Sequence, residues 1–194
     1  WHKQNLAEFA AELPAIFHQP VDFVGVSSVL DEPSNQYLMW LCESWWQKKP
    51  VFAQSSALYL DIQCAYQQPQ QLGIDRWLHI LAVAPQQPVC VVSCGTAVTI
   101  DVVANNRHLG GFILPNMNLQ LLALVQGTQG VRPIEVEQPS LSLGHNTSQA
   151  VYHGILLACV GAIETAYRQQ QLEQPLALIL TGGTAHKIAQ HLQI

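Results

Sequence analysis

The stretch Cys90–Pro115 constrains the fold most, because it describes three β-strands in immediate succession. An apolar, β-rich run reaches Gly95-Thr96, and a second run of β-branched residues leaves that corner. A polar break then precedes Gly110-Gly111 and a third apolar run. Two β runs around a tight Gly-Thr corner are typical of a hairpin. The segment therefore predicts a hairpin followed by a third strand.

The Gly95-Thr96 corner has two interpretations. Gly95 allows backbone amides to approach an anion closely, and the hydroxyl of Thr96 adds a donor. The corner is not a Walker loop, because no Lys follows the glycine and the next element is a strand rather than a helix. A plain hairpin turn explains the same pattern.

The residues before this hairpin predict a strand–helix–strand unit. Residues 4–18 carry apolar side chains at helical spacing, and Val21–Leu30 is expected to form a buried strand. Ser34 can cap the next helix, and a short strand follows Pro50. This order suggests a βαβ unit and an α/β fold.

A second helix is expected over Ile74–Ala84, with Asp75 and Arg76 in its first turn. An ionised carboxylate at this place could accept a proton from an attacking hydroxyl group. On the local pattern alone, a helix-capping Asp followed by a solvent-facing Arg is the better interpretation. Tyr66, in the loop before the helix, is either the wall of a pocket or an ordinary core aromatic.

The chain after Pro115 is expected to be helical with interruptions through Gln126, and Asn146 or Thr147 is expected to cap a long helix. Thr147 could instead bind a ligand. Glycines inside that helix would permit another element to approach closely.

Leu176–Leu180 is expected to be a buried strand, and Thr181-Gly182-Gly183 opens the last helix. Backbone amides at such a helix start can bind an anion, although a glycine turn between strand and helix explains the same residues.

Metal and nucleophile motifs are sparse. Asp101 could hold a hydrated magnesium ion near phosphates, or it could end a strand and bond to the next turn. The eight histidines show no metal-binding spacing, which favours surface or partly buried roles. The absence of a Gly-x-Ser-x-Gly elbow disfavours a serine hydrolase.

Composition excludes several classes of protein. Hydrophobic residues make up 49% and charged residues 11%, which predicts a globular chain. The net charge of -5, with eight scattered Lys and Arg, argues against a nucleic-acid binder. No apolar run reaches a bilayer-spanning length, so no membrane segment is expected. Five cysteines without a framework spacing indicate a reducing cytoplasm.

Five motifs in order resemble the type III pantothenate kinases. They are GxDRW at Gly73–Trp77, GTAxTxD at Gly95–Asp101, GGxIxP at Gly110–Pro115, NTxxAxxxG at Asn146–Gly154 and TGGxA at Thr181–Ala185. The resemblance implies the α/β fold of the actin and sugar-kinase superfamily, with two ribonuclease-H-like lobes of mixed sheets flanked by helices. The expected lobes are residues 1–86 and 87–194.

The resemblance also implies ATP-dependent phosphorylation of pantothenate to 4'-phosphopantothenate, the first step of coenzyme A biosynthesis. Asp75 would be the general base, and Mg²⁺ would accompany ATP. Members are homodimers, so a homodimer is expected, with neither nucleic acid nor a membrane as a partner. The substrate-binding residues would be Tyr66, Gly73, Ile74, Asp75, Arg76 and Thr147, and the ATP-binding residues would be Gly95, Thr96, Gly182 and Gly183.

Three departures from the family pattern matter. The family's N-terminal phosphate-binding hairpin and its C-terminal end are expected to be missing from these 194 residues. Ser93 stands where many relatives have an Asp associated with a bound K⁺ or NH₄⁺, so dependence on a monovalent cation is doubtful. Asn116 replaces a usual glycine, a mild change because Asn tolerates left-handed backbone. The alternative is a non-catalytic relative, since some members were first described as accessory factors for gene regulation.

Overall fold

The computed structural model describes residues 21–83, 87–170 and 175–194, and its contacts divide the chain into two compact units. The first unit comprises Trp1–Ser56 with Gln68–Leu78, and the second comprises Ala57–Gln67 with His79–Ile194. The helix expected over residues 4–18 lies outside the described residues. The expected division into lobes after residue 86 stays a prediction.

The first unit contains the expected strand–helix–strand unit. Strands β1 (Gly25–Val26) and β2 (Val51–Phe52) pair in parallel on either side of α2 (Glu32–Trp46) in the sequence. The buried strand expected over Val21–Leu30 is wrong, because only two of its residues pair with β2 and none of the ten is fully buried. The connection through a helix is the one that parallel strands require.

The start of α2 differs from the sequence-based expectation. Its N-cap is Asp31, whose Oδ1 accepts a hydrogen bond of 3.2 Å from the backbone amide of Ser34. Pro33 occupies the first turn, where its fixed φ suits a helix and its missing amide costs nothing. The helix therefore begins before Ser34, and the expectation that Ser34 is the cap is wrong.

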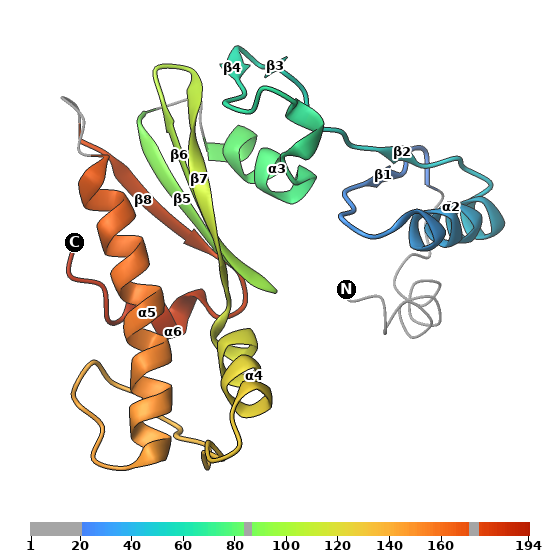
Figure 1. Cartoon of the computed structure of the whole chain (residues 1–194). Helices are drawn as coiled ribbons and strands as arrows, with labels where there is room; N and C mark the ends of the chain where they lie inside the picture. Colours follow the sequence, from blue (N-terminus) through green and yellow to red (C-terminus); the bar gives the residue numbers. More distant parts are fainter. Residues whose placement is uncertain (1–20, 84–86, 171–174) are drawn as a thin grey trace. The chain divides into compact units, whose positions relative to one another are not determined.

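The second unit is built on a six-stranded sheet in the order β3-β4-β7-β6-β5-β8 (Figure 1). Strands β5, β6 and β7 pair antiparallel, as the hairpin and third strand predicted from the sequence require. The two neighbours β4 and β8 run parallel to β7 and β5, respectively. The strands are β3 Leu58–Tyr59, β4 Ile62–Gln63, β5 Val89–Cys94, β6 Ala97–Ala104, β7 Arg107–Pro115 and β8 Ala177–Thr181.

Helices cover this sheet and form the core with it. The long helix α5 (Thr147–Gln169) lies along the sheet with α4 (Met117–Gly127) beside it, and α6 (Ala185–Ala189) follows β8 (Figure 1). Helix α4 is continuous, so the interruptions expected after Pro115 are absent from it. The buried side chains of α5 are Ile155, Leu156, Cys159, Val160, Ile163 and Ala166, which pack with the inner residues of β5 and β6.

Helix α5 contradicts the expectation that no segment is long and apolar enough to span a membrane. Over Thr147–Gln169 the helix is long and apolar enough to cross a bilayer by length and composition. The sequence search for unbroken apolar runs overlooked it because small and polar residues interrupt the run. Since Leu156 and Ile163 are fully buried in the core, the helix also fits the core of a soluble protein, and it is weak evidence for a membrane span.

The last strand is more exposed than expected, and the last helix is shorter. Strand β8 is half-buried because it lies at the edge of the sheet and pairs on one side only, with β5. The expectation of a fully buried strand over Leu176–Leu180 holds for Leu176 alone. The helix that follows spans five residues, Ala185–Ala189, and begins after Thr184.

Candidate functional site

The turn after β8 and the turn after β5 meet at one edge of the second unit's sheet. The two strands are parallel with Ser93 opposite Thr181, so their carboxyl ends lie side by side. Gly182 has a φ of 98°, and a β-carbon built on it would lie 2.5 Å from the carbonyl oxygen of Cys94. Only glycine fits such a close approach in this region of φ. The structure thus brings the predicted ATP-binding turns together.

Thr184 stabilises the same contact through two hydrogen bonds. Its backbone amide and its Oγ1 both donate to the carbonyl oxygen of Cys94, at 3.3 and 3.1 Å. A carbonyl oxygen has two lone pairs and can accept both bonds. Sequence reasoning missed Thr184, because its partner is distant along the chain and nothing in the local pattern indicates the pairing.

The Gly95-Thr96 corner is exposed, as an anion-binding turn must be. The amide side chain of Asn116 donates 2.9 Å to the carbonyl oxygen of Gly95, and its Oδ1 accepts 2.8 Å from Leu119 N at the start of α4. Asn116 therefore ties the corner to a helix N-terminus. Its φ is -66°, so the tolerance of Asn for left-handed backbone plays no part in this substitution.

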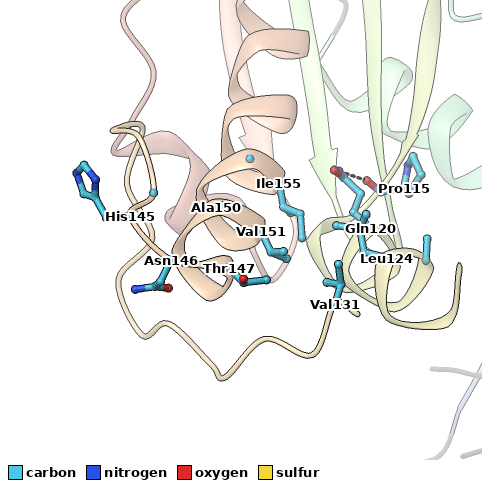
Figure 2. Close-up of a pocket in the computed structure, with 13 residues that line it drawn as sticks. Pro115, Gln120, Leu124, Val131, His145, Asn146, Thr147, Ala150, Val151 and Ile155 are labelled. Carbon is cyan, nitrogen blue, oxygen red and sulfur yellow. Dashed lines mark hydrogen bonds between the residues drawn. The ribbon is translucent and has the colours of Figure 1, made fainter. Parts of the chain in front are cut away.

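Thr147 lines a cavity of about 850 Å³ between α4 and α5 (Figure 2). It is the first residue of α5, and the cap is Asn146, whose Oδ1 accepts 2.9 Å from Gln149 N. The alternative in which Thr147 caps the helix is therefore wrong. The cavity wall is mostly apolar and includes Leu124, Val131, Val151 and Ile155.

The loop between α4 and α5 lines one side of this cavity. A β-carbon on Gly144 would lie 2.3 Å from the backbone nitrogen of Ala150, so the loop packs directly on the first turn of α5. The amide of His145 also donates 3.0 Å to Oε1 of Gln149. The only signal in the sequence was a glycine shortly before the cap residue.

The first unit holds a separate cavity of about 450 Å³ beside the predicted substrate loop. Gly73 and Ile74 line it, and Ile74 begins α3 (Ile74–Val83). Asp75 is exposed in the first turn, whereas Arg76 is only 3% exposed. The interpretation of Arg76 as a solvent-facing residue is therefore wrong, and the carboxylate of Asp75 is the more accessible of the two charged groups.

Two contacts shape the loop that carries Asp75. The buried hydroxyl of Ser55 donates 2.8 Å to the carbonyl oxygen of Leu72, which fixes the end of the loop before α3. A β-carbon on Gly73 would lie 2.7 Å from Oδ1 of Asp75, so glycine gives this carboxylate its space. Sequence reasoning missed Ser55, whose isolated hydroxyl gives no motif.

Asp101 and His108 form a buried pair in the second unit. Oδ1 of Asp101 lies 2.9 Å from Nε2 of His108, and the two residues are 1% and 2% exposed. Asp101 lies inside β6, so the strand-end interpretation is wrong, and its burial does not fit a hydrated magnesium ion. The expectation that the histidines are surface or partly buried fails for His108.

Tyr66 lies against this pair. Its ring stacks on the imidazole of His108 with a centroid distance of 6.2 Å and an interplanar angle of 17°. Tyr66 is half-buried, so it is not a fully buried core aromatic, and its place in a pocket wall stays a prediction.

The five cysteines are buried, and burial affects the reactivity of Cys90 and Cys94. They form no disulfide. Burial raises the pKa of Cys90 and of Cys94 to about 11, with a smaller contribution from the charge of Asp101 at Cys90. The thiols of Cys90 and Cys94 are therefore protonated near neutral pH and are poor nucleophiles. Among the described residues, no cluster of three His, Cys, Asp or Glu side chains could hold a metal ion.

The predicted site residues fall into two groups. Gly73, Ile74, Asp75 and Arg76 belong to the first unit, around the smaller cavity. The second unit contributes Tyr66 at the buried pair, Thr147 at the larger cavity and the two glycine turns at the sheet edge.

The family model and two similar proteins indicate the same family. The family description of type III pantothenate kinases matches residues 2–169. The type III pantothenate kinase of Acinetobacter baumannii (strain ACICU) is 43% identical over 194 residues, covering 99% of this chain and 78% of that protein. The type III pantothenate kinase of Acinetobacter baylyi is 46% identical over 177 residues, covering 91% of this chain and 71% of that protein.

A solved structure supports the fold. A conserved protein from Campylobacter jejuni, assigned to the Baf family of transcriptional activators, superposes with a TM-score of 0.65 over 95% of this chain and 76% of that chain. The two sequences are 23% identical, so the similarity shows a shared fold alone. This fold is a mixed α/β architecture with sheets flanked by helices, as expected from the sequence.

Proposed function

This chain belongs to the type III pantothenate kinase family, and on that premise we propose that it transfers the γ-phosphoryl group of ATP to pantothenate. The product is 4'-phosphopantothenate, the first intermediate of coenzyme A biosynthesis. The observation that carries the proposal is the meeting of the Gly182 turn with the Gly95-Thr96 corner at one sheet edge, in a chain that matches the family over most of its length.

The sheet edge supplies groups suited to a nucleotide. The amide of Gly95 donates 3.0 Å to the carbonyl oxygen of Ala97 and holds the corner, so the hydroxyl of the exposed Thr96 is the donor that we assign to phosphate oxygens. The exposed turn at Gly182-Gly183 offers open backbone to the adenosine. Phosphoryl transfer depends mainly on positioning and charge stabilisation, and it needs little covalent chemistry from the protein. Magnesium enters as part of the ATP complex and neutralises phosphate charge.

Asp75 is the proposed general base toward the pantothenate hydroxyl group. The carboxylate is exposed at the N-terminus of α3, and the loop before it borders the smaller cavity. As a base it would take the hydroxyl proton while the oxygen attacks the γ-phosphorus, the bond from that phosphorus to the β,γ-bridging oxygen breaks, and ADP leaves. Gly73, Ile74 and Arg76 on this loop, with Tyr66 and Thr147, are the further residues we assign to substrate binding.

We extend the proposal to a homodimer. Large apolar side chains are exposed on three neighbouring elements: Phe112 and Ile113 on β7, Leu119 and Leu122 on α4, and Leu157 on α5. On α5, a β-carbon at Gly154 or Gly161 would meet nothing within 4 Å, so a partner's element could approach closely. Light scattering on the purified protein would measure the mass, and a monomer at micromolar concentration would refute the dimer.

The cellular setting follows from charge and thiol chemistry. Five free buried cysteines suit a reducing cytoplasm, and a net charge of -5 disfavours nucleic acid as a partner. A role as a non-catalytic accessory factor is not favoured, because relatives that are 43% and 46% identical are kinases by name.

The test of the function is product formation. The gene product, with its intact mass recorded, is incubated with ATP, magnesium and pantothenate, and 4'-phosphopantothenate is measured by mass spectrometry. An incubation without pantothenate controls for ATP hydrolysis. Product would establish the kinase, and a folded, full-length protein that forms none would refute the proposal.

A further inference from the structure

The buried pair Asp101–His108 has no part in the proposed chemistry, yet it underlies a residue assigned to substrate binding. We propose that His108, oriented by Asp101, is a positioning residue for Tyr66 and thereby sets the affinity for pantothenate. The inference rests on the proposed function, in which Tyr66 contacts the acceptor substrate.

Strand register brings the pair together. His108 on β7 lies opposite Val103 on β6, and Asp101 lies two residues from Val103 on the same face of the sheet. Asp101 and His108 are therefore diagonal neighbours, close enough for long side chains to meet. A register shift between Val102 and Val103 sets this alignment.

The hydrogen bond fixes the orientation of the imidazole ring. An ionised carboxylate only accepts hydrogen bonds, so Nε2 of His108 is the donor to Asp101. Nδ1 of His108 is buried and has no hydrogen-bond partner in the described part of the chain. The bond to Asp101 is thus the polar contact that holds the ring plane in place.

Tyr66 stacks on the imidazole ring of His108 because two strands pair nearby. Strand β4 pairs with β7 at Gln63 and Arg107, and Gln63 N donates 3.0 Å to the carbonyl oxygen of Asn106. This pairing delivers Tyr66, three residues further along, to His108 on β7. The rings then stack nearly parallel, a geometry in which aromatic pairs attract each other.

A flat ring beneath a half-buried Tyr restricts the rotation of the Tyr side chain. A free Tyr would have to be ordered when the substrate binds, and ordering a side chain weakens binding. Because the imidazole of His108 already orders the Tyr66 side chain in the free protein, less conformational entropy is lost when the substrate binds. Its loss should therefore weaken pantothenate binding while leaving the ATP turns, which belong to other strands, unaffected.

Two variants separate the ring from the hydrogen bond. His108→Gln keeps a nitrogen donor for Asp101 but removes the flat ring, and His108→Phe keeps the ring but removes the donor. We expect His108→Gln to raise the KM for pantothenate by roughly three- to tenfold, the range that an aromatic pair contributes. The kcat should change by less than about twofold, and the KM for ATP should be unchanged. His108→Phe should restore most of the pantothenate affinity, and His191→Gln is the matched control.

A double-mutant cycle shows whether His108 acts through Tyr66. In a Tyr66→Leu background, His108→Gln should raise the KM for pantothenate no further, because the side chain that it positions is gone. The same increase in both backgrounds, or equal increases in both KM values, would overturn the inference. If His108→Phe does not fold, the cycle with His108→Gln still decides the question.

The outcome also separates this inference from the proposed function. Wild-type protein that makes no phosphopantothenate would overturn both. Wild-type turnover with additive effects in the cycle would overturn the role of His108 alone and leave the kinase in place.

Discussion

Gly182 lies so close to Cys94 that a β-carbon on the glycine would come within 2.5 Å of the Cys94 carbonyl oxygen. This contact joins the end of β8 to the end of β5 and leaves the next residues, Gly95 and Thr96, exposed at the corner. The contact therefore determines the shape of the edge where we place the nucleotide.

Gly182→Ala should destabilise the protein. Its φ of 98° is strained for Ala, and the methyl group would displace the backbone of β5. Strain of this kind costs about 2 kcal/mol, which corresponds to a melting temperature about 4–8 °C lower for a chain of this size. Gly183→Ala is the matched control for stability, because its β-carbon would meet nothing within 4 Å. Equal melting temperatures for the two variants would contradict the close contact.

Asp75→Asn tests the general base. The variant keeps the size of the side chain but cannot take a proton, so turnover should fall by roughly 100-fold or more. The KM for ATP should stay near its wild-type value, since Asp75 does not belong to the glycine turns. Asp61→Asn removes the same charge from an exposed turn between β3 and β4 and serves as the control. An unchanged rate for Asp75→Asn in a phosphopantothenate assay would refute this role.

The central sheet and the long helix were predictable from local patterns. Apolar, β-branched runs on both sides of Gly95-Thr96 predict a hairpin, and Asn146 before an apolar periodic run predicts the start of α5. The strand expected at Val21–Leu30 failed because two residues alone find a partner strand there. Hydrophobic runs report burial, but pairing with another segment decides where a strand begins and ends.

The contacts of the candidate site were largely beyond sequence reasoning. The approach of Gly182 to Cys94 and the pairing of His108 with Asp101 both depend on strand order and register. Local spacing contains neither, because a shift of one residue turns every side chain to the other face. The family resemblance singled out Gly182 and Tyr66 but gave no reason to notice His108 or Ser55.

Asn116 should link helix stability to ATP affinity. Asn116→Ala loses both the cap of α4 and the bond to Gly95, so the melting temperature should fall by about 2–4 °C, the effect of about 1 kcal/mol. Asn116→Asp keeps an acceptor for the cap but has no amide donor for the Gly95 carbonyl. Both variants should raise the KM for ATP by about threefold, the value of one hydrogen bond. A normal KM for ATP in Asn116→Asp would show that the link to the corner is unimportant.

Ionisation of the Cys90 thiol should lower the free energy of unfolding at alkaline pH. Burial raises the pKa of its thiol from 9.0 in the unfolded chain to about 11 in the folded one. The unfolded state therefore loses its proton first, so the stabilisation is complete below pH 9 and is lost as the pH rises toward 11. Melting temperatures measured across this range should fall more steeply in the wild type than in Cys90→Ala. Parallel curves would show that this thiol does not contribute.

The protein should show no dependence on potassium. Ser93 is half-buried in β5 between Thr99 and Thr181, and it brings a neutral hydroxyl to a position where the family resemblance implies a carboxylate. Cation affinity depends strongly on the number of charged oxygen ligands. The rate of phosphopantothenate formation should therefore stay flat when potassium replaces choline at constant ionic strength, a condition that keeps screening of the charged substrates equal. Ser93→Asp restores the charge and should introduce a rate increase with potassium. Activation of the wild type by potassium would mean that other oxygen atoms hold the cation without this carboxylate.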